Sequence, residues 1–245
     1  MFHMSHEGST YRTYFNWSSG KDSALALHYL LSNPEYSVEH LLTSVNASVD
    51  RVSMHGVRRA LLEQQIEAIG IPASTVELPE EPTMEVYEER MTAALNKLTK
   101  KGLKHAAFGD IFLEDLKTYR EDQLKKMDVQ AHFPLWKRDT KELIREFIDL
   151  GFKTVVVCVN SEFMDESFVG RTIDSDFLKD LPKNVDPCGE NGEFHTFCFD
   201  GPIFKHPVDF KLGEKVFRSY QNPNSEDDLC GKSLGFWFCD LVPLD

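Results

Sequence analysis

The sequence has no apolar run close to the ~20 residues that a membrane-spanning helix needs, and its amino terminus lacks an apolar signal-like core. We therefore expect a cytoplasmic protein with no membrane partner. Basic residues are also scarce, since 27 Lys and Arg stand against 40 Asp and Glu, for a formal net charge of −13. This balance argues against a broad phosphate-neutralising surface, and so against nucleic acid as a partner.

Paired cysteine motifs are missing as well. The five cysteines form no Cys-x-x-Cys pair, and their odd number leaves one thiol over in any disulfide scheme. Reduced, mostly buried thiols are the expectation. They are Cys158, Cys188, Cys198, Cys230 and Cys239.

The first half of the chain alternates between strand and helix patterns. Residues 11–17 have a strand pattern, and Leu27 and Leu31 mark one face of the helix that follows. Such βα repetition predicts an α/β fold with a doubly wound, mostly parallel sheet covered by helices on both faces. The other expected strands of this half are 40–45, 74–78 and 105–108, and its other helices are 58–69, 82–101 and 114–127.

The pattern changes beyond residue 127. Two strands, 129–133 and 154–160, flank a helix at 139–150, which begins with the capping-box spacing of Asp139 and Glu142. A hairpin is expected near Asn191-Gly192, followed by short aromatic strands up to Val242.

These patterns predict two domains, residues 1–130 and a smaller α/β domain at 131–245. The long polar loops 161–187 and 219–233 are candidate lids.

Two common nucleotide-binding motifs, the Walker A loop and the Gly-x-Gly-x-x-Gly turn, are absent. The first predicted strand instead runs into SSGKDS, residues 18–23, at the start of a helix. In a doubly wound sheet, ligands bind beyond the carboxyl ends of the strands, where a helix N-terminus offers free N–H groups. The position of this turn therefore favours phosphate binding.

The residue types in the turn suit a phosphate. Its serines supply hydroxyl donors, Gly20 allows close backbone approach and Lys21 adds a cation. Asp22 would repel a phosphate unless a divalent cation lay between them, which suggests Mg²⁺ bound by Asp22. A simple helix N-cap is the alternative interpretation. The hydroxyl donors are Ser18, Ser19 and Ser23.

A second unusual run, DPCGENGEFHT, covers residues 186–196. An extended segment after the expected turn would place Glu193 and His195 on one face, with Glu190 across the turn. Two carboxylates and an imidazole can orient an amine, relay a proton or share a metal. A solvated hairpin tip is the alternative. A zinc site of Cys188, His195 and Cys198 would lack a standard ligand spacing.

The loop SSGKDS resembles the pyrophosphate-binding loop Ser-Gly-Gly-x-Asp-Ser of the N-type ATP pyrophosphatases. Ser19 stands where that pattern has glycine, and a positive φ there would be strained. Together with GENGEFHT, the loop resembles the diphthine–ammonia ligase group of these enzymes. Similar stretches occur in order between them, at residues 54–58, 63–72, 108–111 and 133–136.

The resemblance implies that ATP lies across the opening loop, with adenine near Ser44 to Asn46 and His55. Gly109-Asp110 follows a predicted strand and would border the same crevice, so that Asp110 would assist Mg²⁺ or the ribose. A plain turn is the alternative there. The run that holds Glu190, Asn191, Glu193 and His195 would carry the catalytic groups.

The implied activity is that of an ATP-dependent amide ligase. A substrate carboxylate would be adenylated with release of pyrophosphate, and ammonia would then displace AMP. In the named group the acceptor is diphthine on a translation elongation factor. Rival interpretations are an ATP-binding regulator without turnover and a sulfur-transferring tRNA-modifying pyrophosphatase. The sequence allows a homo-oligomer without predicting one.

Overall fold

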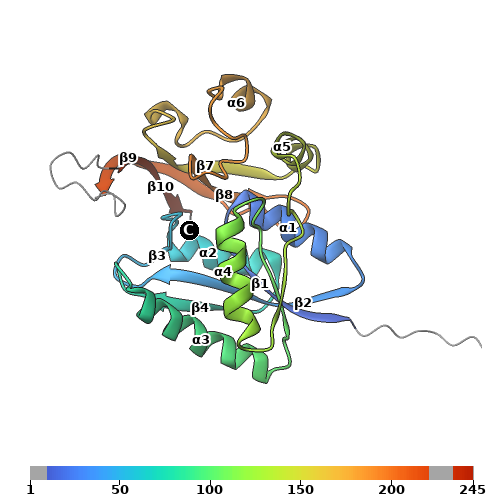
Figure 1. Cartoon of the computed structure of the whole chain (residues 1–245). Coiled ribbons are helices and arrows are strands. Elements are labelled where there is room, and N and C mark those ends of the chain that lie inside the picture. The colour runs from blue at the N-terminus through green and yellow to red at the C-terminus, as the bar shows by residue number, and fades with distance from the viewer. Residues whose placement is uncertain (1–9, 221–233, 245) are drawn as a thin grey trace, which may run out of the picture.

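The computed structural model describes residues 10–220 and 234–244 (Figure 1). Two sheets carry the fold. The first, sheet A, contains β1 (Tyr11–Asn16), β2 (Tyr36–Asn46), β3 (Arg51–Val52), β4 (Ala73–Leu78), β5 (His105–Ala107) and β6 (Gln130–His132). The expected strands of the first half are all present, and β2 begins four residues earlier than its apolar pattern suggested.

The strand order of sheet A creates a switch point. One edge of β2 pairs with β1 and the other with β4, while β1 also pairs with β5 and β5 with β6, all in parallel. The chain thus leaves β1 in one direction through β2 and β4, and crosses back to β5 and β6 on the other side. Ligands of open α/β sheets bind at such a reversal, here the carboxyl ends of β1 and β5.

Alternating side chains along β1 and β2 are buried under helices on both faces of sheet A. Phe15 and Leu41 belong to a core that includes α1 (Lys21–Ser32) and α2 (Arg59–Ile69), whereas Tyr14 and Leu42 pack on the opposite side. That opposite layer consists of α3 (Met84–Lys100) and α4 (Glu114–Lys125). The doubly wound α/β prediction is confirmed.

The second sheet, sheet B, is antiparallel throughout. Its order is β8 (Phe194–Asp200), β7 (Lys153–Asn160), β10 (Leu234–Pro243) and β9 (Phe210–Tyr220). Three short helices accompany sheet B in this part of the chain: α5 (Thr140–Asp149), the 3-10 helix η1 (Glu166–Phe168) and α6 (Ser175–Asp180). The helices α1 and α2 lie between the two sheets, and one buried core joins both (Figure 1).

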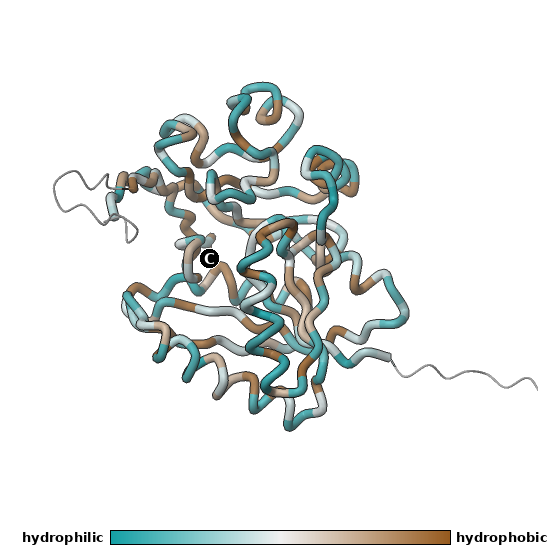
Figure 2. The backbone as a smooth tube through the Cα atoms, viewed as in Figure 1, coloured by the Kyte–Doolittle hydropathy of each residue, from teal (hydrophilic) through white to brown (hydrophobic). Residues whose placement is uncertain are grey.

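Local sequence signals explain where the helices begin and end. Asp139 accepts hydrogen bonds from the amides of Lys141 and Glu142 at 2.9 and 3.0 Å, as the capping spacing predicts. Gly70 ends α2 in the left-handed conformation. Figure 2 shows α4 as mainly hydrophilic, and Leu124 is its buried apolar residue. Arg120 of α4 also forms an ion pair with Asp110, with 3.1 Å between Nε and Oδ2.

The prediction of a hairpin at Asn191-Gly192 is wrong. The segment 187–193 is a series of turns. The strand β8 begins directly after it, but no strand leads directly into it. A type I′ turn needs positive φ at both central residues. Gly192 has a φ of 82°, but Asn191 is not in that region.

The last strands are also longer than expected. β9 and β10 pair with each other over most of their length, whereas short strands were predicted. The candidate lid 219–233 lies mainly outside the described residues. Within the described ranges, no helix combines the length and apolar character needed to cross a bilayer.

Candidate active site at the carboxyl ends of β1 and β5

The loop 18–23 joins β1 to α1 at the switch point. The hydroxyls of Ser18 and Ser23 lie 2.6 Å apart, and the Ser23 hydroxyl accepts a hydrogen bond from the Ser18 amide. Gly20 is the N-cap of α1 and has no side chain to satisfy the first amide groups. A helix that begins in this way can receive an anion.

Two close approaches show which segments border this loop. A Cβ atom on Gly20 would lie 2.7 Å from Cε1 of His55, and one on Gly109 would lie 2.9 Å from the Ser23 amide nitrogen. Neither site has room for a side chain. His55 and Gly109 therefore flank the loop on two sides, and both were expected near it.

Ser19 adopts the strained conformation considered above. Its φ is 71°, its side chain is buried, and its hydroxyl has no hydrogen-bond partner among the described residues. The conformation is held through its carbonyl oxygen, which accepts hydrogen bonds from the Cys198 amide at 2.9 Å and from Gln65 Nε2 at 3.1 Å. Tertiary contacts thus maintain a shape that suits glycine.

Replacing Ser19 with glycine is expected to stabilise the protein by about 1 kcal/mol, because it removes left-handed strain and an unpartnered buried hydroxyl. The gain is reduced by the extra flexibility of glycine in the unfolded chain. Urea unfolding measures it, with Ser48→Gly in an exposed turn as the control. An unfolding free energy lower than that of the wild type would contradict the strain.

Lys21 and Asp22 form an ion pair at the entrance to α1. The ammonium of Lys21 lies 2.7 Å from one Asp22 oxygen, also donates to the carbonyl of Cys188, and sits 5.3 Å from the ring centre of Phe194. Burial favours the neutral amine, but the charge and hydrogen bond of Asp22 together with other nearby groups, Glu190 among them, outweigh it, so the pKa of Lys21 is raised. Lys21 thus remains a cation that joins the loop to the second motif.

Asp22 stays partly accessible although it pairs with the buried Lys21. Its side chain is 31% exposed, against 3% for Lys21. Burial raises the pKa of Asp22, the charge of Lys21 opposes this, and Asp186 adds to it. Asp22 is therefore a partly exposed carboxylate beside other carboxylates.

Glu193 organises the loop 186–193 from within. Its buried carboxylate accepts hydrogen bonds from the amide of Asp186 at 2.9 Å, the amide of Asn191 at 2.8 Å and Nδ2 of Asn191 at 3.0 Å. These bonds satisfy both oxygens. Glu193 and Asn191 thus shape the loop that presents the Cys188 carbonyl and Glu190.

Glu190 connects this loop to the segment after β5. One carboxylate oxygen accepts hydrogen bonds from the amides of Ile111 and Phe112, at 2.9 and 3.2 Å. Burial and the charge of Asp22 raise the pKa of Glu190 to about 7, although the two amides and Lys21 oppose the shift. A carboxyl group with this pKa can exchange a proton near neutral pH.

Replacing Glu190 with glutamine is expected to flatten the dependence of the unfolding free energy on pH. The pKa of Glu190 is about 7 in the folded protein, above its usual value of 4.5, so the folded state binds this proton more tightly. Its stabilising effect is full below pH 4.5 and is lost as the pH rises through 7. Urea unfolding from pH 5 to pH 8 tests this, with the exposed Glu162→Gln as the control; equal slopes for the wild type and Glu190→Gln would contradict it.

The two histidines of the site stand next to each other. The ring centres of His55 and His195 are 4.9 Å apart, and Nδ1 of His55 lies 2.9 Å from the carbonyl oxygen of Thr196. Burial lowers the pKa of His55 to about 4, against the hydrogen bond to Thr196, and lowers that of His195 to about 3; Lys21 adds to both shifts, and His55 adds to that of His195. Both imidazoles are therefore neutral at pH 7.

Asp110 lies on the β5 side of the loop 18–23, next to Gly109. Its Oδ2 lies 3.1 Å from Arg120 Nε without the alignment of a hydrogen bond, while its Oδ1 accepts one from Nη2 of Arg120 at 3.3 Å. Burial raises the pKa of Asp110, the charge of Arg120 opposes this, and that of Asp22 adds to it. The two aspartates are thus close enough to influence each other.

Asn46 lies apart from this group. It ends β2, and its side-chain oxygen accepts a hydrogen bond from the Ser48 amide at 2.9 Å. No hydrogen bond between described residues joins Asn46 to the loop 18–23. His55, by contrast, contacts the loop directly.

Sequence reasoning missed two side chains that position the loop. Thr196 Oγ1 accepts a hydrogen bond from the Lys21 amide at 3.0 Å, and the buried Gln65 bonds Trp17 as well as Ser19. Gln65 was detectable, since it is a polar residue on the apolar face of α2, between Leu62 and Ile69. Thr196 closes the GENGEFHT motif but offered no signal of its own.

The donor set fits Mg²⁺ better than zinc. The described residues contain no group of three or more His, Cys, Asp or Glu arranged to hold a metal. Mg²⁺ is commonly held by one or two carboxylates plus substrate phosphates. Asp22 and Asp110 are such oxygen donors; burial raises the pKa of each, and a neighbouring carboxylate adds to the shift. Cys188 and Cys198, in contrast, are buried thiols whose pKa is raised by burial.

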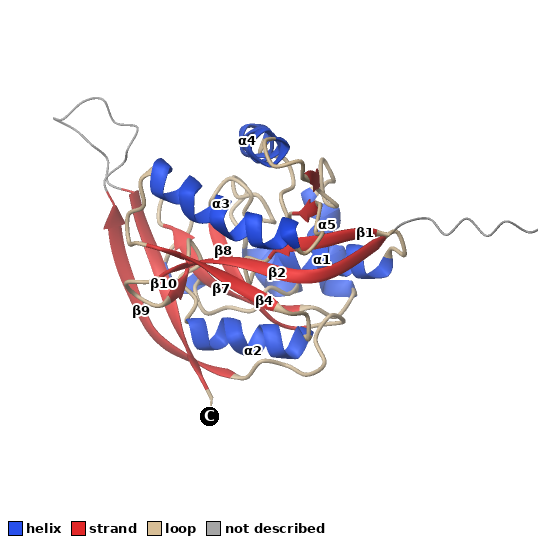
Figure 3. Cartoon of the chain, turned by 90° about the horizontal axis from the view of Figure 1, so that it is seen from below, coloured by secondary structure: helices blue, strands red, loops and turns tan. Residues whose placement is uncertain are grey.

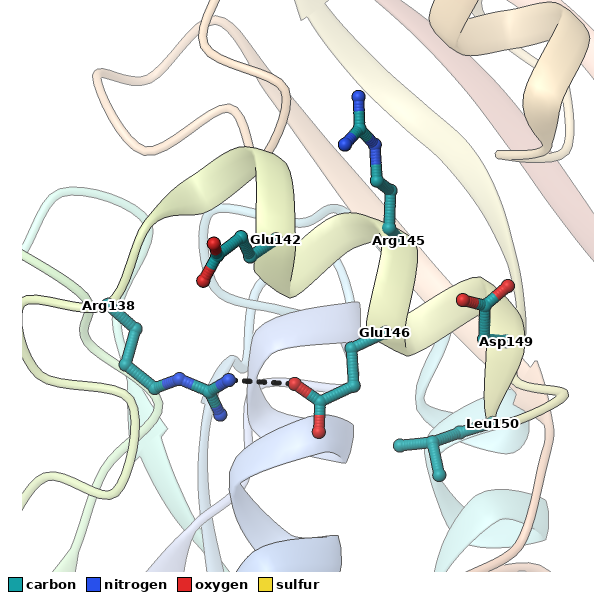
Figure 4. A pocket seen from close by; sticks show the side chains of 6 residues that line it. All are labelled: Arg138, Glu142, Arg145, Glu146, Asp149 and Leu150. Carbon is teal, nitrogen blue, oxygen red and sulfur yellow. Dashed lines mark hydrogen bonds and ion pairs between the residues drawn. The ribbon is translucent and has the colours of Figure 1, made fainter.

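One surface pocket lies away from the switch point. It has a volume of about 450 Å³ on the outer side of α5, where Arg138 and Glu146 form an ion pair of 2.8 Å (Figure 4). None of its lining residues belongs to the switch point. They are Arg138, Glu142, Arg145, Glu146, Asp149 and Leu150.

The strand order and the loop at the switch point define a doubly wound α/β protein with a candidate phosphate loop. Comparison with known families is more specific. Residues 11–131 match the diphthamide synthase N-terminal domain, and residues 139–222 match the diphthamide synthase C-terminal domain. The chain belongs to the diphthamide synthase family.

Several curated proteins are similar to part of this chain. The diphthine–ammonia ligases of Homo sapiens and Mus musculus are each 29% identical over 125 residues, which is 49% of this chain and 47% of the relative. That of Schizosaccharomyces pombe is 26% identical over 110 residues, 43% of this chain and 18% of the relative. The matched region spans about half the length, or less, of these relatives.

Proposed function

We propose that the protein is an ATP-dependent amide ligase that adenylates a carboxylate and transfers ammonia to it, releasing AMP and pyrophosphate. One observation carries the proposal: the loop 18–23, Asp110 and the loop 186–193 converge at the switch point, where Lys21 links the first and last of them. Membership of the diphthamide synthase family supports it, and so do the names of the similar proteins.

The first step joins an acceptor carboxylate oxygen to the α phosphorus of ATP and breaks the bond to the bridging oxygen. In the proposal, the amides of α1 that follow Lys21, with Ser18 and Ser23, receive the departing pyrophosphate, since the Lys21 amide donates to Thr196. Asp22 would hold Mg²⁺, with Asp110 beside it, and the ion would neutralise phosphate charge. His55 borders the nucleotide from the β3 side.

In the second step the nitrogen of ammonia attacks the acyl carbon, and AMP leaves with the electron pair of the broken C–O bond. The attacking nitrogen must lose a proton. Glu190 is the proposed base, because its pKa of about 7 suits the transfer, whereas His195 has a pKa of about 3 and is a weak base. Glu193 and Asn191 position Glu190 by shaping its loop.

Further proposals concern substrate and setting. The acceptor is a carboxylate, and the names of the relatives make diphthine the first candidate, which the resemblance places on a translation elongation factor. We also propose two domains, 1–130 and 131–245, and a cytoplasmic location. The four described cysteines, all free and buried, support a reducing compartment.

Product analysis tests the function. The protein is incubated with Mg-ATP, ammonium and candidate carboxylates, diphthine-bearing protein included, and nucleotides are separated by chromatography. AMP and pyrophosphate in equal amounts, dependent on the acceptor, are expected. ADP and phosphate would exclude the pyrophosphate-releasing mechanism, and tight ATP binding with no product from any acceptor would favour a regulator.

A further inference from the structure

The strand β9 is an exposed edge of sheet B. Figure 3 shows it as the outermost strand on its side, and each residue from Glu214 to Tyr220 is exposed. Phe217 is 51% exposed and Tyr220 47%. Proteins usually shorten, cover or charge such edges, because the free N–H and C=O groups can pair with another strand.

The sequence of β9 is complementary to itself when read in the opposite direction. With Val216 opposite Val216 of a second copy, Glu214 faces Arg218 of that copy and Arg218 faces Glu214. Lys215 of each copy would face Phe217 of the other copy. Directly opposite residues share a face of the sheet, so the charged pairs lie on one side and the cation–aromatic pairs on the other.

We propose that two copies of this chain associate through antiparallel pairing of β9 with β9 about a twofold axis at Val216. The two four-stranded sheets would then form one continuous eight-stranded sheet. Twofold symmetry repeats each contact, which gives two ion pairs and two cation–aromatic pairs around the central valines. The inference is independent of the proposed enzyme activity.

The charges select this register over its neighbours. Moving the twofold axis by one residue, to Lys215 or to Phe217, places that residue opposite its own copy. In both of these registers Glu214 no longer faces Arg218. Like charges directly opposite are destabilising. Only the register centred on Val216 pairs both acidic residues with basic ones.

Local structure limits the pairing to the second half of β9. A bulge places Gly213 and Glu214 opposite the single residue Asp240, so the regular pairing of β9 with β10 begins at Lys215, directly after Glu214. Beyond that point Lys215 donates a hydrogen bond to the carbonyl of Glu166 at 3.0 Å, which holds its stem in place. Phe217 is held against Trp237, with ring centres 5.1 Å apart.

Sedimentation velocity over a range of concentrations, with charge-reversed variants of the full chain, tests the proposal. The wild type should show a monomer–dimer equilibrium. Arg218→Glu and Glu214→Arg should each weaken dimerisation about tenfold, since each opposes like charges twice. The double variant restores opposite charges and should return the dissociation constant to within about threefold of the wild type.

Lys211→Glu is the matched control, because Lys211 is an exposed cation of the same strand outside the paired segment; its effect should stay below about twofold. Circular dichroism verifies the fold of each variant. A wild type that stays monomeric at all concentrations would overturn the proposal. A dimer that ignores the reversals, or a double variant as weak as the single ones, would also overturn it.

Discussion

Asp22→Asn is expected to lower acceptor-dependent AMP formation by about 100- to 1000-fold, with ATP binding weakened less. The substitution keeps the shape of the side chain and one acceptor oxygen for Lys21, but it removes the negative charge that would hold Mg²⁺ against the phosphates. Steady-state kinetics of AMP release, at saturating ATP and a range of Mg²⁺ concentrations, measures the effect. A shift of activity to higher Mg²⁺ would locate the defect in metal binding.

The control for Asp22→Asn is Asp128→Asn. Asp128 is 94% exposed and pairs with Lys104, far from the switch point in the sequence and in sheet A. This variant should retain turnover within about twofold. Loss of the Asp22 charge also leaves the buried Lys21 without its counter-ion, so thermal unfolding of both variants must be followed. Undiminished AMP formation by folded Asp22→Asn would refute the assigned role.

Glu193→Ala is expected to destabilise the protein by about 2–5 kcal/mol and to abolish most turnover. The variant removes the acceptor of three N–H donors, from Asp186 and Asn191, in a place where the carboxylate itself is only 1% exposed. Loss of the loop shape would then displace Glu190. Urea unfolding gives the free energy, and hydrogen exchange at the Asp186 and Asn191 amides reports the loop directly.

Glu193→Gln serves as an intermediate variant for that measurement, and Glu162→Ala serves as its control. Glutamine retains one acceptor oxygen, so its effect should fall between those of the wild type and the alanine variant. Glu162 is exposed and lies at the end of β7, so its removal should change the unfolding free energy by less than about 0.5 kcal/mol. If the Asp186 and Asn191 amides remained protected in Glu193→Ala, Glu193 would not be the residue that orders the loop.

Most elements of the fold followed from local patterns. Apolar spacing located α1 and α2 to within one or two residues, and Asp139 capped α5 where its spacing to Glu142 indicated. The hairpin at Asn191-Gly192 failed because a turn dipeptide predicts a hairpin only when strands flank it. Here Glu193 supplies side-chain bonds that fold the segment as a closed loop instead.

The sequence predicted which residues meet at the site better than it predicted what each side chain contacts there. Lys21 was expected to face phosphate, yet its ammonium contacts Asp22 and the Cys188 carbonyl. Glu193 was grouped with the reacting residues, and the structure places its carboxylate among amides of its own loop. Spacing along the chain cannot distinguish these cases, because a carboxylate has the same pattern whether it faces a ligand or a backbone N–H.

The sequence by itself determined most helices and strands of the first half, the start of α5, and that a phosphate-type turn follows the first strand, because periodicity, capping and turn chemistry are local. The tertiary structure alone decided that Thr196 meets the Lys21 amide across 175 residues and that Glu190 meets the amides of Ile111 and Phe112 across 79 and 78 residues. Those contacts depend on how sheet B packs over α1 and α2. They exist only once the apolar surface shared by both sheets is buried.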